Sequence, residues 1–315
     1  MNMKLFQTIL CPIDFSEQSL HALAHAALLA TRNSGQLVAL FVEDPMLASA
    51  AAVEYGEGSL LSKSRTELQR LVEQTAATHG LSMTSTTIDV AVGKAHEEIV
   101  RSADRLKCDL IVMGSQGRTG ASRVMVGSTT HRVLRDSPLP VLATPPLEPH
   151  VERPSDDWPG KSALAPLDLG ARDRADALAA AVAARELGVQ LQLVHVVEPV
   201  AGVPWLDVDE AGRNQKRHRK ALAELTKLKA TLAWAVTECH VAAGTPADEI
   251  AKLASSTDVG LVIMTRRRGK GLFGPKQGSI SYEVLTRAKT AVLALPSDKK
   301  WVRRAVSLAP TDHVP

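Results

Sequence analysis

The residues of the chain that are best suited to chemistry are glycines and small hydroxyl residues of its first half. Gly114, Gly117 and Gly120 follow the apolar run at 108–113, and a Gly-Ser-Thr segment stands at 127–129. Glycines let the backbone turn tightly and aim several N–H groups at one point, and a helix opening at 127–129 would add its own amides. The spacing matches neither a Walker A loop nor a Gly-x-Gly-x-x-Gly loop. The residues alone leave two interpretations open, a plain turn and a cradle for an anion such as phosphate.

A carboxylate and two histidines are the other candidates. Asp14 follows the first strand-like run and could accept hydrogen bonds from a ribose or a base. His21 and His25 are four residues apart on a predicted helix but have no third ligand nearby in sequence, so we predict no metal site. No Ser-His-Asp, Cys-His or paired-carboxylate pattern stands out, and we predict no catalytic residue.

The chain that carries these residues repeats itself. When the sequence is shifted by 151 residues, 92–145 aligns with 243–296 without a gap, and Gly127-Ser128 falls on Gly278-Ser279. A repeat of this length indicates two whole domains rather than a solenoid. We predict domains at 1–144 and 161–296, with a proline-rich extended linker at 145–160 and a tail at 297–315.

Strand-like and helical segments alternate in each half. The first half predicts strands at 5–11, 36–42, 84–91, 108–113 and 139–143, and helices at 17–32, 60–79, 95–106 and 122–135. The second half predicts strands near 162–166, 189–197, 234–242, 259–264 and 291–295. Strands separated by helices of this length predict an α/β fold: two tandem doubly wound domains, each with a five-stranded, mostly parallel sheet and helices on both faces.

Composition narrows the function classes. Aromatic residues make up only 3% of the chain, which disfavours single-stranded nucleic-acid modules that stack bases on aromatic rings. The net charge of +3 is too small to imply a polyanion partner, although it divides into −2 for residues 1–150 and +5 for residues 151–315. The three cysteines are widely spaced, and no apolar run is long enough to span a membrane. We therefore predict a cytoplasmic protein.

The glycine pattern has a counterpart in a known family. Gly114-Ser115-Gln116-Gly117, nine further residues and then Gly127-Ser128 match the ATP-binding pattern of universal stress proteins, and the chain resembles a tandem member over roughly 4–144 and 161–296. The segments CPIDFSE at 11–17 and FVED at 41–44 resemble the family's first two strand ends. The resemblance implies ATP binding, with or without magnesium. It makes Pro12 a nucleotide-binding residue, turns Asp14 toward the nucleotide, sets the Val42 backbone against the adenine, and places Met113, Gly114, Gly117, Gly127, Ser128 and Thr129 on the ribose and phosphate side.

The second half departs from this pattern. Asp168 and Gly278-Ser279 are present, but Thr265 and Arg268 stand where the first half has its two loop glycines. Side chains there would crowd a phosphate loop. We predict weak or absent ATP binding in this half, and we interpret its arginine-rich loop either as a solvated basic surface or as an anion or partner site.

Three functions fit these residues. The first is a stress-response protein that binds ATP through its N-terminal domain and is regulatory rather than strongly catalytic. The alternatives are a slow ATPase that uses the same site and a nucleotide-free interaction protein of the same fold. The last strands, 139–143 and 291–295, should be sheet edges whose pairing would make an intramolecular pseudo-dimer, with a homodimer also possible. We predict neither a nucleic-acid nor a membrane partner.

Overall fold

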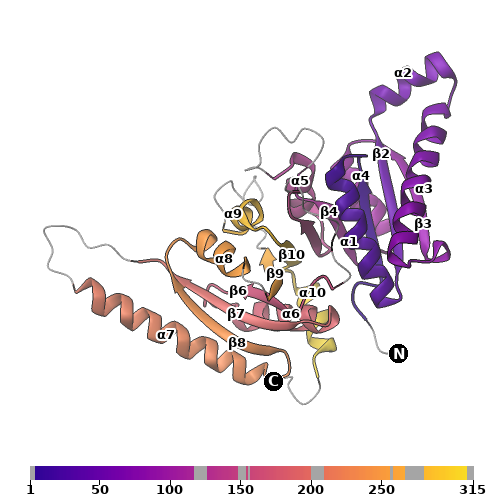
Figure 1. Cartoon of the computed structure of the whole chain (residues 1–315). Coiled ribbons are helices and arrows are strands. Elements are labelled where there is room, and N and C mark those ends of the chain that lie inside the picture. The colour runs from indigo at the N-terminus through magenta and orange to yellow at the C-terminus, as the bar shows by residue number, and fades with distance from the viewer. Residues whose placement is uncertain are drawn as a thin grey trace, which may run out of the picture. The chain divides into compact units, whose positions relative to one another are not determined.

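The computed structural model describes residues 4–116, 126–147, 154, 157–199, 209–255, 258–266 and 280–310. The chain forms two compact units, and the division falls between Trp158 and Pro159 (Figure 1). Each unit is an α/β structure around its own parallel sheet, which confirms the predicted fold class.

The N-terminal unit has five strands in the order β3-β2-β1-β4-β5, all parallel in their pairings. Its strands are β1 (Thr8–Ile13), β2 (Gln36–Glu43), β3 (Thr86–Val92), β4 (Leu110–Gly114) and β5 (Val141–Thr144). Its helices are α1 (Glu17–Asn33), α2 (Pro45–Tyr55), α3 (Ser59–His79), α4 (Ala95–Arg105) and α5 (Ser128–Asp136), with a 3-10 turn at Met83–Ser85.

The C-terminal unit repeats this order, with strands running β10-β9-β6-β7-β8, again parallel. Its strands are β6 (Ser162–Pro166), β7 (Gln190–Val197), β8 (Val236–Ala243), β9 (Val259–Arg266) and β10 (Ala291–Pro296). Its helices are α6 (Asp173–Glu186), α7 (Glu210–Thr231), α8 (Pro246–Ala254), α9 (Ile280–Arg287) and α10 (Lys299–Leu308).

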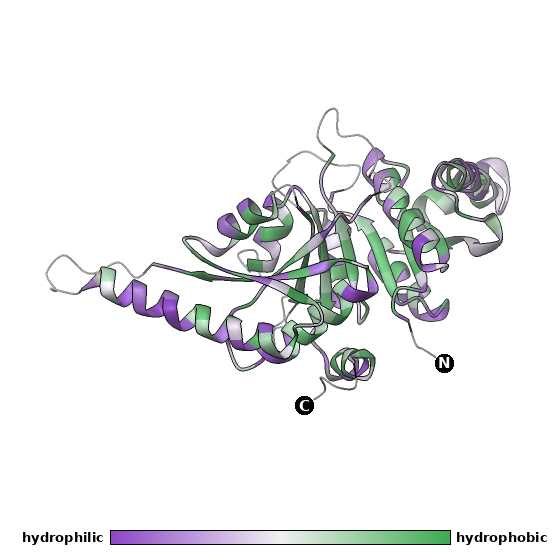
Figure 2. Ribbon diagram, turned by 60° about the horizontal axis from the view of Figure 1, so that its bottom comes forward, coloured by the Kyte–Doolittle hydropathy of each residue, from purple (hydrophilic) through white to green (hydrophobic). Residues whose placement is uncertain are grey.

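Small aliphatic side chains build both cores, as the low aromatic content suggests. Helix α1 buries Ala22, Ala26, Ala27 and Leu23, and α6 buries an unbroken alanine and valine run from Ala179 to Ala184. The strands and the inward faces of the helices are the apolar parts of each unit in Figure 2. Alanine-rich helices can approach a sheet closely, so these cores reach native packing without large rings.

Several predicted boundaries are wrong for a physical reason. The first strand begins at Thr8 rather than at residue 5, because Phe6 takes a left-handed backbone conformation (φ 58°) and the Asp109 carboxylate accepts hydrogen bonds from the Gln7 and Thr8 amides. Leu5 and Phe6 are buried all the same, as loop residues. The last helix of the N-terminal unit begins at Ser128 rather than at 122, since Val126 and Gly127 are not helical. Residues 122–125 lie outside the described residues.

Two helices, α2 and α10, were not predicted. Helix α10 falls in the segment predicted to be a tail, but Trp301 is only 5% exposed and the helix packs on α6. The Asp298 side chain caps it by accepting from the Trp301 amide, and Arg185 of α6 donates to the carbonyl of Leu308. This segment is therefore part of the C-terminal unit.

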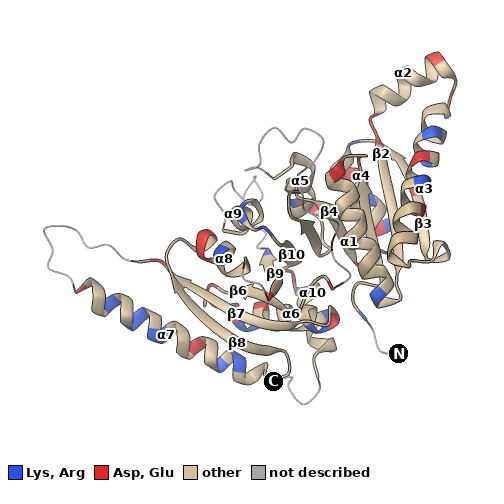
Figure 3. Ribbon diagram, in the orientation of Figure 1, with Lys and Arg blue, Asp and Glu red and all other residues tan. Residues whose placement is uncertain are grey.

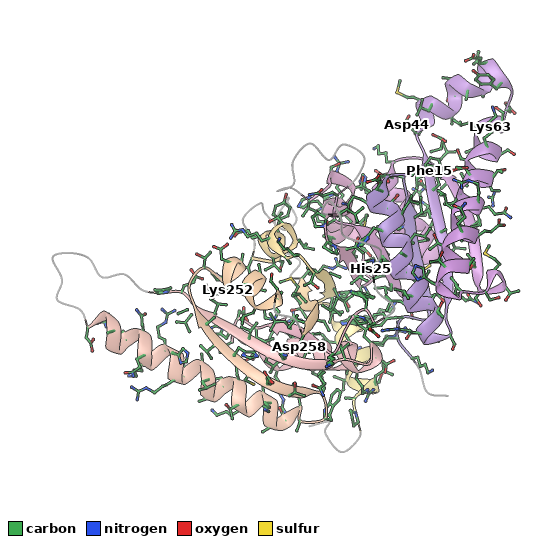
Figure 4. The ribbon with its side chains drawn as sticks, viewed as in Figure 1. Phe15, His25, Asp44, Lys63, Lys252 and Asp258 are labelled. Atoms are coloured by element: carbon green, nitrogen blue, oxygen red, sulfur yellow. The ribbon has the colours of Figure 1, made fainter. Side chains whose placement is uncertain are left out.

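The end of the predicted linker is also ordered. Residues 157–159 form a turn, and the Trp158 ring meets the ring of His25 on α1 edge to face, with 4.6 Å between centroids. Figure 4 labels His25 on this helix. The basic run at 213–220 lies on the exposed part of α7, whose ribbon carries several of the blue segments in Figure 3, as expected for a solvated helix face.

Candidate functional site

The strand order places a switch point between β1 and β4. Strand β1 is followed in the sheet by β2 and β3 on one side and by β4 and β5 on the other. The register pairs β1 with β4 only at Ile9 and Leu10, whereas β1 stays paired with β2 as far as Ile13. Beyond Leu10, therefore, no backbone pairing joins the carboxyl ends of β1 and β4. In open α/β sheets, such a crevice is where ligands bind.

The turn that leaves β1 is tightly built. An Asp14 carboxylate oxygen accepts hydrogen bonds from the Ser16 amide and hydroxyl, and Ser16 in turn caps α1 by accepting from the Ser19 amide. Ser16 is thus the N-cap residue of α1. Between them, Phe15 takes φ 63°, a conformation that costs a bulky residue about 1–2 kcal/mol. Strained backbone conformations of this kind cluster at functional sites, and Phe15 lies at the predicted site.

The end of β2 lies beside this turn. Val42 is half-buried there, and the Phe41 ring packs on the Phe15 ring at 4.7 Å between centroids. Figure 4 shows Phe15 and Asp44 at the same end of the N-terminal sheet. The sequence analysis missed both phenylalanines, because nothing in their spacing signals that the two rings meet.

The other side of the switch point is formed by β4. Met113 is buried and Gly114 ends the strand. A Cβ added to Gly114 would lie 3.0 Å from the carbonyl oxygen of Gln116 and 3.2 Å from that of Gln18 on α1. Gly114 is therefore needed for close packing of the first turn of α1 against the end of β4, whatever it binds.

Helix α5 is fastened over the end of β4 by two hydrogen bonds. The Gly127 amide donates to the carbonyl of Ser115 at 2.7 Å, and the Thr130 hydroxyl donates to the carbonyl of Gly114 at 2.7 Å. The amides of Ser128 and Thr129 belong to the first turn, which has no intrahelical acceptors. Gly127 itself has φ −57° and ψ 144°, which any residue can adopt, so its own backbone does not require glycine.

Three buried side-chain oxygens at these strand ends have no hydrogen-bond partner: Ser115 Oγ, Thr144 Oγ1 and Gln18 Oε1. Ser115 follows β4, and Thr144 pairs with Gly114 across β4 and β5. Buried hydroxyls are ordinarily satisfied by protein, water or a ligand.

Eight of the nine predicted binding residues thus lie at the carboxyl ends of β1, β2 and β4 or at the start of α5: Pro12, Asp14, Val42, Met113, Gly114, Gly127, Ser128 and Thr129. Gly117 lies outside the described residues. Which of them touch a ligand stays a prediction.

The remaining candidates for chemistry in the N-terminal unit, two cysteines and two histidines, are buried. Burial raises the pKa of the Cys11 thiol far above its usual range and that of Cys108 to about 12, so neither is a nucleophile at neutral pH. All three cysteines are free. The rings of His21 and His25 meet edge to face, and the described residues contain no cluster of histidine, cysteine, aspartate or glutamate suited to a metal ion. No helix in the described part of the chain is long and apolar enough to cross a membrane.

The C-terminal unit reuses the first turn but changes what surrounds it. Asp168 accepts from the Gly170 amide, and Leu169 between them takes φ 53°, as Phe15 does. However, α6 begins five residues after Asp168, whereas α1 begins three residues after Asp14. Strand β9 ends in Thr265 and the buried Arg266, where the first half has Gly114 and Ser115. The segment with Arg268, Gly278 and Ser279 lies outside the described residues.

The family model of the universal stress protein family matches the chain twice, at residues 5–145 and 161–296. The chain therefore belongs to this family of stress-response proteins and carries two of its domains in tandem. No particular function of this chain follows from the family alone.

Single-domain relatives match half of the chain. Universal stress protein MJ0531 of Methanocaldococcus jannaschii is 33% identical over 146 residues, which is 44% of this chain and 81% of the relative. Universal stress protein MJ0577 of the same organism is 30% identical over 152 residues, 44% of this chain and 94% of the relative. The crystal structure of a universal stress protein from Archaeoglobus fulgidus covers 93% of this chain and 99% of its own, with a TM-score of 0.62 and 20% identity, a likeness of fold.

Proposed function

We propose that the N-terminal unit binds an adenine nucleotide, ATP, at the switch point between β1 and β4, and that binding is regulatory rather than a step in rapid catalysis. The observation that carries the proposal is positional. Gly114 of the family's nucleotide pattern ends β4, Asp14 follows β1 on the other side of the switch point, and the Thr130 hydroxyl ties α5 to the end of β4.

The chemistry of the site suits the two ends of a nucleotide. First-turn amides of α5 and the exposed Ser128 hydroxyl favour an anion, as helix N-termini do for phosphates. The strand ends at Pro12 and Val42 offer backbone groups to a base, and Phe15 and Phe41 supply an apolar wall beside them. Magnesium would reach the site with the phosphates, because the described residues form no metal cluster of their own.

The direct test identifies what the purified protein carries. Nucleotide released by denaturation is analysed by chromatography, and ATP is then titrated into nucleotide-free protein by calorimetry, with and without magnesium. We expect ATP, at one per chain. ADP alone would favour the slow ATPase, and the absence of any binding would favour a nucleotide-free interaction protein.

The repeat supplies a matched control. Gly127→Val should abolish ATP binding, whereas Gly278→Val, the same change at the equivalent position of the second half, should leave it unchanged. Two ATP per chain, or loss of half of the binding in each variant, would contradict our prediction that the C-terminal unit binds weakly or not at all.

Two further predictions accompany this function. The three free cysteines support a reducing compartment, and we place the protein in the cytoplasm. The tandem domains support an intramolecular pseudo-dimer through β5 and β10, because both are the last strands of their sheets.

A further inference from the structure

Helix α2 leaves the N-terminal unit with an apolar surface that nothing in the described structure covers. None of its residues is fully buried, and Met46, Leu47, Val53 and Tyr55 are 83%, 60%, 90% and 62% exposed. Glu54 is its one ionised residue. Helices that are apolar nearly all round are ordinarily buried, and clustered exposed apolar residues mark interaction surfaces.

The helix is nevertheless built to form. Pro45 occupies its first turn, and the Asp44 side chain caps it by accepting from the Met46 amide at 2.7 Å. Gly56 and Gly58, both with positive φ, turn the chain into α3, and the Lys63 ammonium lies 5.2 Å from the centre of the Tyr55 ring. An isolated helix of 11 residues is marginal in water, so a capped apolar helix of this length indicates a partner surface.

The two sides of α2 differ. Ala48, Ala51 and Ala52 are half-buried on the side toward α3, and Met46, Ala50 and Val53 form the opposite, exposed side. The exposed residues are spaced i, i+4 and i+7, which aligns them in one stripe. In the stripe a large side chain lies at each end and alanine lies in the middle. Figure 1 shows α2 extending beyond the end of the N-terminal sheet.

We propose that this stripe, Met46–Ala50–Val53, is a homodimer surface on which the α2 helix of a second copy packs antiparallel, with the two-fold axis at Ala50. An isologous pair sets Met46 of each copy beside Val53 of the other, and the central alanines let the backbones approach. Antiparallel packing also sets the dipoles of the two helices in opposition, whereas a parallel pair would align them.

The charges of α2 argue against other occupants. Membrane-surface helices carry lysine and arginine around an apolar face, and α2 has neither. It likewise lacks the cations that would recruit an acidic protein or a nucleic acid. A copy of the same apolar helix needs no such charge.

The small area of the proposed α2–α2 contact limits the affinity of the dimer. Three helical turns bury less than the roughly 1,200 Å² of a stable interface, so we expect a dissociation constant on the order of micromolar. Sedimentation velocity on the full chain from about 1 to about 100 µM should show a monomer–dimer equilibrium. Val53→Asp should weaken it at least tenfold, because two carboxylates would enter the contact. Leu222→Asp, a matched change at an exposed position of α7, should leave it unchanged.

A cross-link tests the geometry. Ala50→Cys should form an intermolecular disulfide under mild oxidation, since the axis brings the two residue-50 Cα atoms within disulfide range, whereas Leu222→Cys should not. A chain that stays monomeric, or a dimer that Val53→Asp leaves intact, would overturn the proposal. Binding to anionic vesicles that Val53→Asp abolishes, without self-association, would overturn it in favour of a membrane. Nucleotide binding enters none of these readouts.

Discussion

The Thr130 hydroxyl donates a 2.7 Å hydrogen bond to the carbonyl of Gly114, so the first turn of α5 is tied to the last residue of β4. Both groups are buried. This bond fixes the N-terminus of α5 over the switch point at which we place the nucleotide phosphates. It holds the proposed site together without itself needing to touch a ligand.

Thr130→Val should uncouple α5 from β4. The variant keeps the side-chain shape but leaves the Gly114 carbonyl buried without its donor, which costs about 1–3 kcal/mol in the free energy of unfolding. We also expect weaker ATP binding, because the α5 amides lose their position. Urea unfolding and calorimetric titration measure the two effects. Thr130→Ser, which keeps the hydroxyl, should restore both, and no change in either quantity for the valine variant would refute this role.

The two motif glycines at 114 and 127 should respond differently. Gly114→Val forces a side chain against the Gln116 and Gln18 carbonyls, so it should lower the free energy of unfolding by about 1–3 kcal/mol and reduce nucleotide binding as well. Gly127→Val, at an ordinary φ of −57°, should abolish binding while changing stability much less. Thermal unfolding without nucleotide separates the cases. Equal destabilisation by both variants would mean that Gly127 also has a packing role.

The strands and most helices of both halves could be predicted from the sequence because each buried element carries its apolar pattern locally. Helix α2 could not, since its residues are apolar or small at nearly every position and show no period. Helix α10 was missed although Trp301, Val302, Ala305 and Val306 stand at helical spacing, because it follows the last predicted strand in the segment interpreted as a tail. The shift of β1 depended on Asp109, more than 100 residues away.

Part of the candidate site could likewise be predicted from the sequence, and part could not. Gly114 and Gly127 could be predicted as site residues, because the spacing of the glycine pattern to which they belong can be read directly from the sequence. The Phe15–Phe41 contact, the left-handed Phe15 backbone and the early separation of β1 from β4 arise from tertiary structure. No local pattern encodes them. The sequence thus led to residues that the structure places at these strand ends and at the start of α5, but not to the strained turn after β1. Which of these residues bind a ligand stays a prediction.

Removal of Trp301 should show that α10 belongs to the C-terminal unit. Trp301→Ala would leave a cavity against α6, and we expect a loss of about 3–5 kcal/mol in the free energy of unfolding. Chemical unfolding of the full chain measures it. Lys300→Ala, at the exposed neighbouring position, is the control and should change stability little. A tryptophan variant as stable as the control would show that the helix is detached in solution.

Acid should destabilise the N-terminal unit through His25. Its ring is buried between His21, at 4.5 Å, and Trp158, at 4.6 Å, and burial first, then the neighbouring His21 and His79, lowers its pKa to about 3. In the unfolded chain the histidine side chain has a pKa near 6.5, so below that pH it binds a proton that His25 does not bind in the folded chain. Stability is full above pH 6.5 and falls as the pH drops from 6.5 toward 3, by about 2 kcal/mol between pH 6.5 and pH 5 from this group. His21, whose pKa burial also lowers, adds in the same direction.

His25→Phe isolates this effect. The phenyl ring keeps the edge contact with Trp158 but cannot take up a proton, so the fall in stability between pH 6.5 and pH 5 should become shallower by about 2 kcal/mol. Urea unfolding at the two pH values measures the difference. His218→Phe, at an exposed histidine of α7, is the matched control and should leave the slope unchanged. If His25→Phe keeps the full acid sensitivity of the parent chain, other groups carry it.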